Sequence, residues 1–304
     1  MYLKYYLKKL GGSDFPQFLL KYLSCPSLLR LKEVGYFCGM DYASKDIYNF
    51  SEYISRFDHS LTTSLLVYRL THDKKATIAA LLHDIATPCF SHVIDYMNND
   101  FEKQESTEEY TKEIIMNDIY LQICLKKDNI NPEDVINFKK YSIVDNDRPK
   151  LCADRLDGII LTGIGWTKDI TAKEIDKILN DIIIINNEDN EPEIGFRSID
   201  IASKVLEVSN KIDEYCHTKE DNYMMILLGN IVKLAINKGY TSYELLFRLK
   251  EETLFNLLEN KSDEELSSLI TKFKTIKKEE ISDIEVPNVK RRILSPLVAG
   301  NRIN

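Results

Sequence analysis

The segment Lys75-Ala-Thr-Ile-Ala-Ala-Leu-Leu-His-Asp-Ile85 carries the clearest structural signal in this chain. Its apolar side chains recur at the i, i+3, i+4, i+7 spacing that forms one apolar stripe on a helix, at Ile78, Leu81, Leu82 and Ile85. The pair His83-Asp84 interrupts this stripe. Ionisable groups are costly in apolar surroundings unless they are paired or bind a metal, so the pair is a candidate site on a buried helix.

The same pair also has a purely structural interpretation. A backbone carbonyl could satisfy His83, and Asp84 could be a polar residue at the C-terminal end of the helix. A His-Asp pair alone is weak evidence, because the sequence contains a second one. His72-Asp73 precedes Lys74-Lys75 in what we predict to be an exposed turn, and we assign it no role.

The rest of the chain is predicted to be mainly α. Similar apolar patterns predict helices after Ser60, around residues 159–161 and over residues 227–236. One segment differs, because the β-branched run from Ile182 to Ile185 is followed by a polar stretch and then by Ile194-Gly-Phe196, which predicts a small β-hairpin. From about residue 222 onward the helices are rich in Lys and Glu and carry no chemical cluster. We therefore expect a core over residues 1–220 and a C-terminal helical extension over residues 221–304, which packs on the core or in an oligomer interface.

Composition narrows the class of protein. With 304 residues and 44% hydrophobic content, the chain can bury a sizeable core without disulfides. Its six cysteines have no CxxC spacing, which favours free thiols and a reducing cytoplasm. The first residues are too polar for a signal peptide, and no apolar run approaches the roughly 18 residues that span a bilayer. The net charge of −8 argues against general nucleic-acid binding, although a few local basic residues could hold a small phosphate.

Four residues are candidate metal ligands: His59, His83, Asp84 and Asp154. We expect His59 just before the helix that begins near Ser60, the His83-Asp84 pair near the end of the helix over residues 75–85, and Asp154 at the start of Asp154-Arg-Leu-Asp-Gly158. Imidazole and carboxylate groups from several helices can converge on one metal ion. Antiparallel helices joined by short loops would bring these positions together.

Several motifs together resemble a known family. Arg56-Phe-Asp-His-Ser60, Leu81-Leu-His-Asp-Ile85, Phe90-Ser-His92 and Ala153-Asp-Arg-Leu-Asp157 occur in the order and approximate spacing of the HD-domain superfamily, and look most like its deoxynucleoside triphosphate triphosphohydrolase branch. The similarity extends through residues 29–35, Tyr215-Cys-His217 and residues 290–298, so it covers most of the chain. It implies a helical HD-domain core and, as is common in the family, a homo-oligomer.

The resemblance also implies roles for individual residues. The metal, expected to be Mn, Fe, Co, Ni or Mg, would be bound by the four candidate ligands. Arg56, Arg155 and His217 match positions that contact substrate, and His92 with Asp95 matches the family's proton-donating pair. A general acid of this kind typically contributes about 10²-fold to 10⁴-fold in rate.

Each of these roles has an alternative. Arg56 could form a surface salt bridge with Asp58 or Glu52, and Arg155 could pair with Asp157. His92 and Asp95 could be a capping or core polar pair.

The chain also departs from the triphosphohydrolase pattern. Thr87 replaces a histidine, Gln104-Glu105 replaces a His-Glu pair, and Glu33 and Gly158 replace a glutamine and a tyrosine that contact substrate. Glu207 replaces an arginine that meets phosphate, and a carboxylate facing a triphosphate would be repulsive. These departures bear on the substrate more than on the fold.

The sequence therefore predicts a metal-dependent phosphohydrolase that acts on a small-molecule nucleotide or phosphate ester, possibly a deoxynucleoside triphosphate, in the cytoplasm and without a membrane partner. Cleavage of a monophosphate or a cyclic nucleotide stays open. The alternative from another class is a nucleotide sensor or structural homologue that has lost turnover. Oxygen activation at a di-iron centre fits less well, because it needs extra histidine ligands and the chain has only five histidines.

Overall fold

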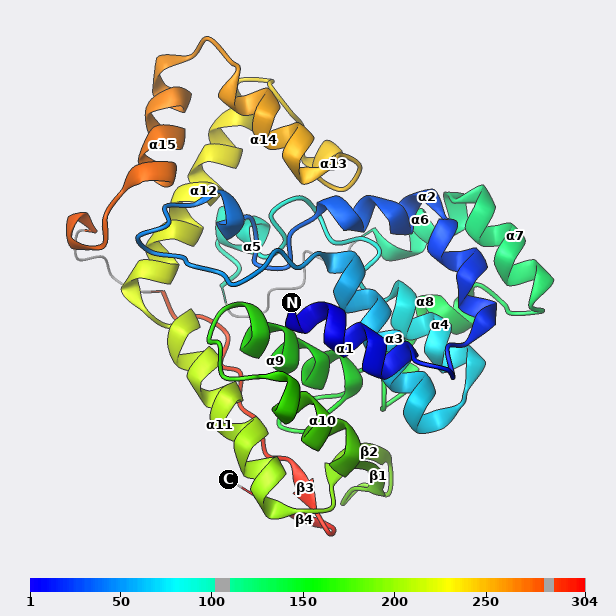
Figure 1. The fold of residues 1–304 in the computed structure, drawn as a ribbon. Helices are drawn as coiled ribbons and strands as arrows, with labels where there is room; N and C mark the ends of the chain where they lie inside the picture. The colour runs from blue at the N-terminus through cyan, green and yellow to red at the C-terminus, as the bar shows by residue number, and fades with distance from the viewer. Residues whose placement is uncertain (102–109, 282–286, 304) are drawn as a thin grey trace.

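The computed structural model describes residues 1–101, 110–281 and 287–303, and most of these residues are helical (Figure 1). The predicted mainly α fold with a small β element is confirmed. Helices α9 to α11 and the sheet occupy the lower part of the view in Figure 1, α12 to α15 the upper part, and α6 to α8 the right-hand side. Two clusters of buried apolar side chains hold these helices together, and Phe50 and Trp166 pack against both.

The larger cluster, which we call the first core, joins the N-terminal half of the chain to residues 153–212. It is built from α1 (Tyr2–Gly11), α2 (Pro26–Arg30), α3 (Arg56–Thr71), α4 (Lys74–Leu82), α6 (Thr111–Asn117), α7 (Ile119–Lys127), α8 (Glu133–Ile136), α9 (Ala153–Gly165), α10 (Ala172–Asp181) and α11 (Ile199–Cys216). Short 3₁₀ segments lie at Gln17–Ser24, Leu31–Glu33 and Phe138–Lys140. Helix α3 packs against both α4 and α9, so it lies between the two elements predicted to supply the other metal ligands.

The start of α3 corrects one sequence expectation. Ser55 and Asp58 form a capping box, in which the Ser55 side chain accepts from the Asp58 backbone N–H and the Asp58 carboxylate accepts from the Ser55 backbone N–H. The helix therefore begins at Arg56. The expectation that His59 lies before the helix is wrong, since His59 is in its first turns.

Helix α4 is shorter at its C-terminal end than the apolar pattern suggests. It begins at Lys74 after Asp73, whose carboxylate accepts from the backbone N–H groups of Lys75 and Ala76, so the second His-Asp pair contributes a helix cap. The helix ends at Leu82, and His83 and Asp84 lie in the turn that follows.

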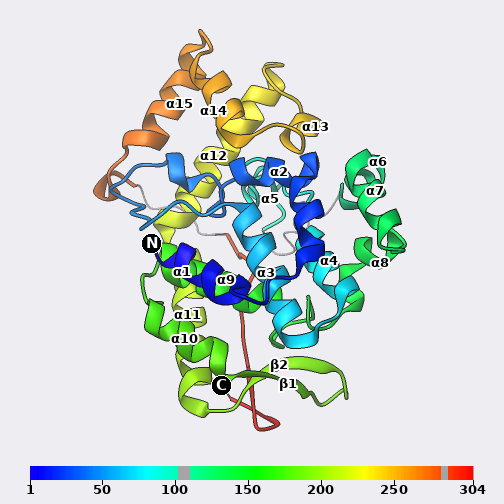
Figure 2. The ribbon, with the colours of Figure 1, turned by 45° about the vertical axis from the view of Figure 1, so that its right-hand side comes forward.

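The predicted β-hairpin is present. Strands β1 (Ile182–Asn186) and β2 (Pro192–Phe196) pair antiparallel, with Ile184 opposite Ile194. The end of the chain adds two short strands that the sequence pattern did not indicate. Strand β3 (Leu297–Val298) runs parallel to β2, and β4 (Asn301–Arg302) completes the order β1-β2-β3-β4. Figure 2 shows the C-terminal segment returning to this sheet.

The smaller cluster, the second core, combines residues 40–48 and 89–97 with residues 224–289. Its helices are α5 (Val93–Met97), α12 (Lys219–Asn237), α13 (Tyr243–Leu246), α14 (Glu251–Glu259) and α15 (Glu264–Thr275), with 3₁₀ segments at Met40–Tyr42 and Lys278–Glu280. Helix α12 packs along α5. The C-terminal helices therefore share a core with the chain that follows the His83-Asp84 turn, while the predicted boundary near residue 220 and the oligomer interface stay predictions.

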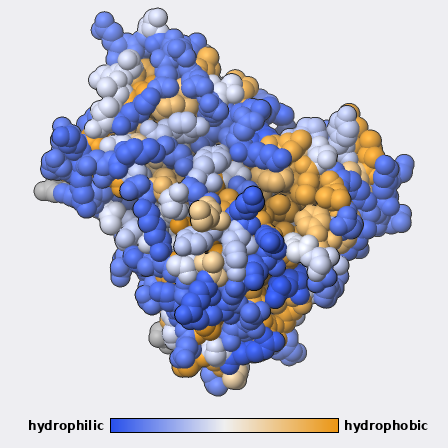
Figure 3. Space-filling view, viewed as in Figure 1, coloured by the Kyte–Doolittle hydropathy of each residue, from blue (hydrophilic) through white to orange (hydrophobic). Residues whose placement is uncertain are grey.

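Figure 3 shows one face largely covered by hydrophilic residues, with hydrophobic residues gathered to the right of its centre. Among the described residues, no helix combines the length and apolar character needed to cross a membrane.

Candidate metal centre

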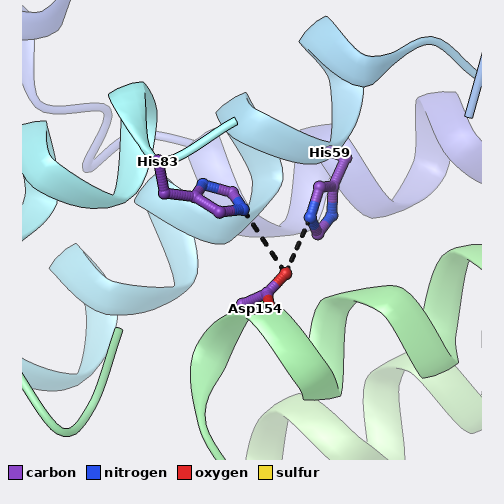
Figure 4. Close-up of side chains that lie close together, drawn as sticks. All are labelled: His59, His83 and Asp154. Carbon is purple, nitrogen blue, oxygen red and sulfur yellow. Dashed lines mark hydrogen bonds and ion pairs between the residues drawn. The ribbon is translucent and has the colours of Figure 1, made fainter. Parts of the chain in front are cut away.

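Three side chains from different helices or helix ends converge on one point (Figure 4). His59 projects from α3, His83 follows the last residue of α4, and Asp154 lies in the first turn of α9. Nε2 of His59 lies 2.9 Å from Oδ1 of Asp154, and Nε2 of His83 lies 3.4 Å from the same oxygen. Their ligand atoms all lie within 4.8 Å of one another, which is close enough for a single metal ion to contact all three.

Asp84 completes the predicted set of four. Its carboxylate oxygens lie 3.8 Å from Nε2 of His59 and 3.8 Å from Nε2 of His83. Nη1 of Arg56 donates a 2.9 Å hydrogen bond to Oδ2 of Asp84. The structure thus brings all four predicted ligands together, with a buried guanidinium beside them.

The hydrogen bonds of the two imidazoles direct their Nε2 atoms toward the centre. Nδ1 of His83 lies 2.7 Å from the backbone oxygen of Ala80, which fixes Nδ1 as the donor. Nε2 of His83 is buried, and it faces the carboxylates of Asp84 and Asp154. Nδ1 of His59 lies 2.8 Å from the carboxylate of Asp157. Carboxylate and carbonyl partners of this kind orient metal-binding histidines.

The electrostatics of the centre favour a bound cation. Burial alone raises the pKa of Asp154, but hydrogen bonds from the two histidines lower it well below its ordinary value. Burial also opposes ionisation of Asp84, yet the charges of His83 and Arg56 lower its pKa to about 2. Conversely, the carboxylates overcome burial and raise the pKa of His59 to about 10. The carboxylates therefore stay charged, and without a metal the imidazoles hold protons near them.

This donor set fits a divalent ion. Two imidazole nitrogens and two carboxylates suit the predicted ions, Mn, Fe, Co, Ni or Mg, better than a soft metal that prefers thiolates. The buried Nε2 of His83 points at the two carboxylates of the same set, Asp84 and Asp154. The fit supports the predicted metal cofactor and leaves its identity open.

The centre lies on the wall of a cavity of about 1030 Å³. Its basic lining residues are Arg56, Lys139, Lys140, Arg148, Lys150, Arg155, Lys290 and Arg292, and its acidic ones are Asp84, Asp145, Asp147, Asp154, Glu191 and Asp221. Two of these acids belong to the metal centre. A bound divalent cation would offset their charge and leave the cavity electropositive in an acidic chain.

A second part of the cavity is aromatic. It is lined by Tyr36, Phe37, Tyr48, Phe50, Tyr96 and Trp166. The rings of Phe37 and Phe50 are stacked with centroids 4.2 Å apart, and Trp166 meets both of them edge-on. Aromatic surfaces of this kind bind flat or apolar organic groups.

The predicted proton-donating pair is assembled in the structure. His92 immediately precedes α5, and its Nδ1 lies 2.9 Å from Oδ2 of the fully buried Asp95. The imidazole of His92 lines the cavity. The arrangement allows Asp95 to orient an imidazole that faces substrate, and the catalytic role stays a prediction.

Arg56 also lies in the cavity wall. The alternative salt bridges of Arg56 are wrong, because Asp58 caps α3 and Glu52 accepts from the N-terminal amine. Its Nε donates to Ser91, its Nη1 to Asp84, and its Nη2 donates to no described residue. One edge of the guanidinium is therefore available to a ligand.

Arg155 and His217, the other two predicted substrate contacts, form hydrogen bonds within the protein instead. Arg155 lines the cavity, but its guanidinium holds the loop before α9 through the side-chain and backbone oxygens of Asn146 and the backbone oxygen of Lys150. It does not pair with Asp157. His217 is not among the cavity-lining residues, and its Nδ1 lies 2.6 Å from the backbone oxygen of Asp213. The prediction that His217 contacts substrate therefore has no geometric support in the described residues.

The departures from the family pattern also look different in the structure. Glu207 is exposed on α11, pairs with Lys204 and does not line the cavity, so the predicted repulsion of phosphate by Glu207 is wrong. Glu33 pairs with Lys250, and the side chain of Thr87 is buried outside the cavity lining. Gln104-Glu105 lies outside the described residues.

Two residues with clear positions at the site were missed by sequence reasoning. Asp157 is fully buried and also accepts hydrogen bonds from Tyr6 and Thr62. Tyr36 packs against His59 with ring centroids 5.1 Å apart. The signal for Asp157 was available, because it lies one turn after Asp154 on the same helix, whereas no local motif marks Tyr36.

Comparisons with known proteins agree with this geometry. Residues 56–142 match the HD domain family. The chain is 28% identical over 223 residues to the uncharacterized protein YdhJ of Bacillus subtilis, covering 72% of this chain and 65% of that protein. It is 23% identical over 251 residues to the metal-dependent phosphohydrolase cns2 of Cordyceps militaris, covering 80% of this chain and 70% of that protein. The alignment thus spans about two thirds of the length of these relatives.

Two solved structures share the fold. A hypothetical protein from Aquifex aeolicus superposes with a TM-score of 0.61 at 17% identity, covering 84% of this chain and 70% of that chain. A phosphohydrolase from Bacteroides thetaiotaomicron superposes with a TM-score of 0.55 at 18% identity, covering 83% of this chain and 71% of that chain. At these identities the likeness is one of architecture.

Proposed function

We infer that this chain, which carries an HD domain over residues 56–142, is a metal-dependent phosphohydrolase. The observation that carries the inference is the meeting of two imidazoles and two carboxylates on the wall of a large cavity whose lining has more basic than acidic residues. We propose that the substrate is a nucleotide, possibly a deoxynucleoside triphosphate. The aromatic lining supports an organic group with a flat ring, and the basic lining supports its phosphates.

A divalent ion held by His59, His83, Asp84 and Asp154 would lower the pKa of bound water toward about 7 and neutralise charge on a phosphate oxygen. The unengaged edge of Arg56 would hold a non-bridging phosphate oxygen. Its bonds to Asp84 and Ser91 fix the guanidinium in position. Donors that are already held in position need little reorganisation when a phosphate binds to them.

His92 would supply the proton to the leaving oxygen. Asp95 accepts from Nδ1 of the ring, which leaves Nε2 as the atom that carries the transferred proton. Asp95 is fully buried, and its contact with Nδ1 holds the His92 ring in one orientation. This role predicts that His92→Asn lowers kcat by about 10²-fold to 10⁴-fold while the metal is retained.

The experiment measures metal content by elemental analysis and phosphate release from a panel of deoxynucleoside triphosphates, monophosphates and cyclic nucleotides. Wild type is compared with Asp154→Ala. The matched control is His72→Ala, because His72 belongs to the exposed second His-Asp pair. We expect metal and product in wild type and the control, and loss of both in Asp154→Ala.

The outcomes separate the two candidate classes. Full metal occupancy in Asp154→Ala would show that the centre is assigned to the wrong residues. Metal in wild type without product from any nucleotide would overturn the phosphohydrolase and support a nucleotide-binding sensor.

A further inference from the structure

Tyr36 is an unassigned residue at the edge of the metal centre. Its backbone N–H donates to the backbone oxygen of Ile54, just before α3, which ties the residue to the helix that carries His59. Its ring lies 5.1 Å from the His59 ring, and the Arg56 guanidinium carbon lies 4.9 Å from the Tyr36 ring centroid. The tyrosine therefore packs directly against one metal ligand and one phosphate-binding candidate.

The hydroxyl of Tyr36 lies over Gly158 of α9. A Cβ atom added to Gly158 would lie 2.8 Å from the Tyr36 oxygen, closer than real Cβ atoms approach other groups. Gly158 follows Asp154 by four residues, so it occupies the same face of α9 one turn further along. A glycine at this position leaves the room that the hydroxyl needs.

This hydroxyl has unused hydrogen-bonding capacity. It forms no hydrogen bond to a described residue, and Tyr36 lines the cavity. A phenol hydroxyl carries its proton at neutral pH, so it can donate as well as accept.

The hydroxyl also lies between two chemically different parts of the cavity. On one side are the metal ligands of the first turn of α9. On the other, further along the same helix, Thr162 and Trp166 line the cavity beside Phe37. If a phosphate ester bound with its phosphate at the metal centre, its organic group would lie next to Tyr36.

We propose that Tyr36 is a substrate-contacting residue whose hydroxyl hydrogen-bonds the hydroxylated organic group next to the scissile phosphate, and that Gly158 is required to admit it. This rests on the proposed phosphohydrolase function. It assigns to the site a ligand class, a phosphate ester of a sugar, in preference to inorganic phosphate or an ester without polar groups. The hydrogen bond contributes specificity for that group, whereas the metal and Arg56 hold the phosphate.

The test measures binding by titration calorimetry with Mn²⁺-loaded protein and two probes, 2′-deoxyadenosine 5′-monophosphate and inorganic phosphate. The variants are Tyr36→Phe, Gly158→Ala and the double variant. The control is Tyr53→Phe, which removes the hydroxyl of a half-exposed tyrosine outside the cavity lining. Circular dichroism and metal content establish that each variant is folded and loaded. Hydrolysis of p-nitrophenyl phosphate is measured separately, as a test of the phosphohydrolase itself.

We expect Tyr36→Phe to weaken nucleotide binding about fivefold to tenfold, the size of a neutral hydrogen bond, and to change phosphate binding less than about twofold. Gly158→Ala displaces the hydroxyl and should give a similar loss. Because both changes remove the same contact, the double variant should be no worse than either single variant.

Three outcomes would overturn the assignment of Tyr36: equal loss for both probes, no loss for the nucleotide, or losses that multiply in the double variant. Absence of nucleotide binding by wild type would overturn it as well. If nucleotide binding responds as expected but p-nitrophenyl phosphate and nucleotides are never hydrolysed, the tyrosine contact stands and the phosphohydrolase fails.

Discussion

Replacing Glu251 by glutamine should remove a large part of the pH dependence of stability. Glu251 begins α14 and is almost fully buried. Its carboxyl group accepts hydrogen bonds from the backbone N–H groups of Phe90, at 2.7 Å, and Gly35, at 3.3 Å. Burial outweighs these bonds and, with the nearby Asp41, raises its pKa from 4.5 to about 8. The folded protein therefore binds this proton more tightly than the unfolded chain.

The sign of the effect follows from this difference. Between pH 4.5 and about 8 the folded state keeps the proton and the unfolded state releases it, so the free energy of unfolding falls as pH rises through this window. One unit of pKa is worth about 1.4 kcal/mol, which gives a ceiling of about 5 kcal/mol. Relaxation and water entry reduce such penalties, and we expect roughly 2–3 kcal/mol.

Glutamine is neutral at every pH and keeps an oxygen that can accept from Phe90. The assay is urea unfolding at pH 5, 6, 7, 8 and 9 for Glu251→Gln and for the control Glu252→Gln, whose side chain is exposed. We expect the two variants to converge at pH 5 and to diverge by roughly 2–3 kcal/mol at pH 9, with Glu251→Gln the more stable. Parallel profiles would refute the reasoning, because they would show that Glu251 ionises equally in both states.

Three further predictions test the metal centre and the first core. Asp157→Asn removes the carboxylate that accepts from Nδ1 of His59 and should lower metal affinity about 10-fold to 100-fold in a chelator competition; unchanged affinity would exclude an orienting role. Chelation should lower the free energy of unfolding by about 2.7 kcal/mol relative to protein with metal at 100 times its dissociation constant, and added Mn²⁺ should restore the melting temperature; an unchanged melting temperature would argue against a resident ion. Leu81→Ala, in the fully buried stripe of α4, should cost about 2–5 kcal/mol in urea unfolding, whereas Leu257→Ala, at a side chain 39% exposed, should cost less than about 1 kcal/mol; similar costs would contradict the assignment of the core.

The sequence was informative where the signal is local. The apolar stripe around Leu81 and the β-branched run at Ile182 predicted the helix and the hairpin, because periodicity and turn chemistry act over a few residues. Helix ends were less accurate, since the capping box at Ser55 and Asp58 sets the start of α3 independently of the apolar pattern. The strand at Leu297 pairs with residues about a hundred positions earlier, which no local pattern encodes.

The candidate site was predicted in part for the same reason. Its ligands belong to compact motifs, whereas the surroundings of the ligands depend on how distant segments pack. In the sequence, Gly158 was interpreted as the loss of a substrate-contacting tyrosine. In the folded chain, the hydroxyl of Tyr36 lies against Gly158. Glu207 was interpreted as a carboxylate that would repel phosphate. Its position on α11 instead directs its side chain to the surface, where it pairs with Lys204. A substitution can be interpreted only when the residue that faces it in space is known.

The division of the buried side chains into two cores has a mechanical consequence. The metal ligands lie in, or directly after, helices of the first core, whereas Asp95 lies in α5 of the second core and His92 immediately precedes that helix. The bond from Arg56 to Ser91 crosses the junction between them. Sliding of one core past the other would alter the distance between acid and metal while both interiors stay intact. Since a displacement of about 1 Å can cost roughly 10²-fold in rate, the proposed reaction would be sensitive to packing at this junction, and a substitution there could change turnover without changing stability.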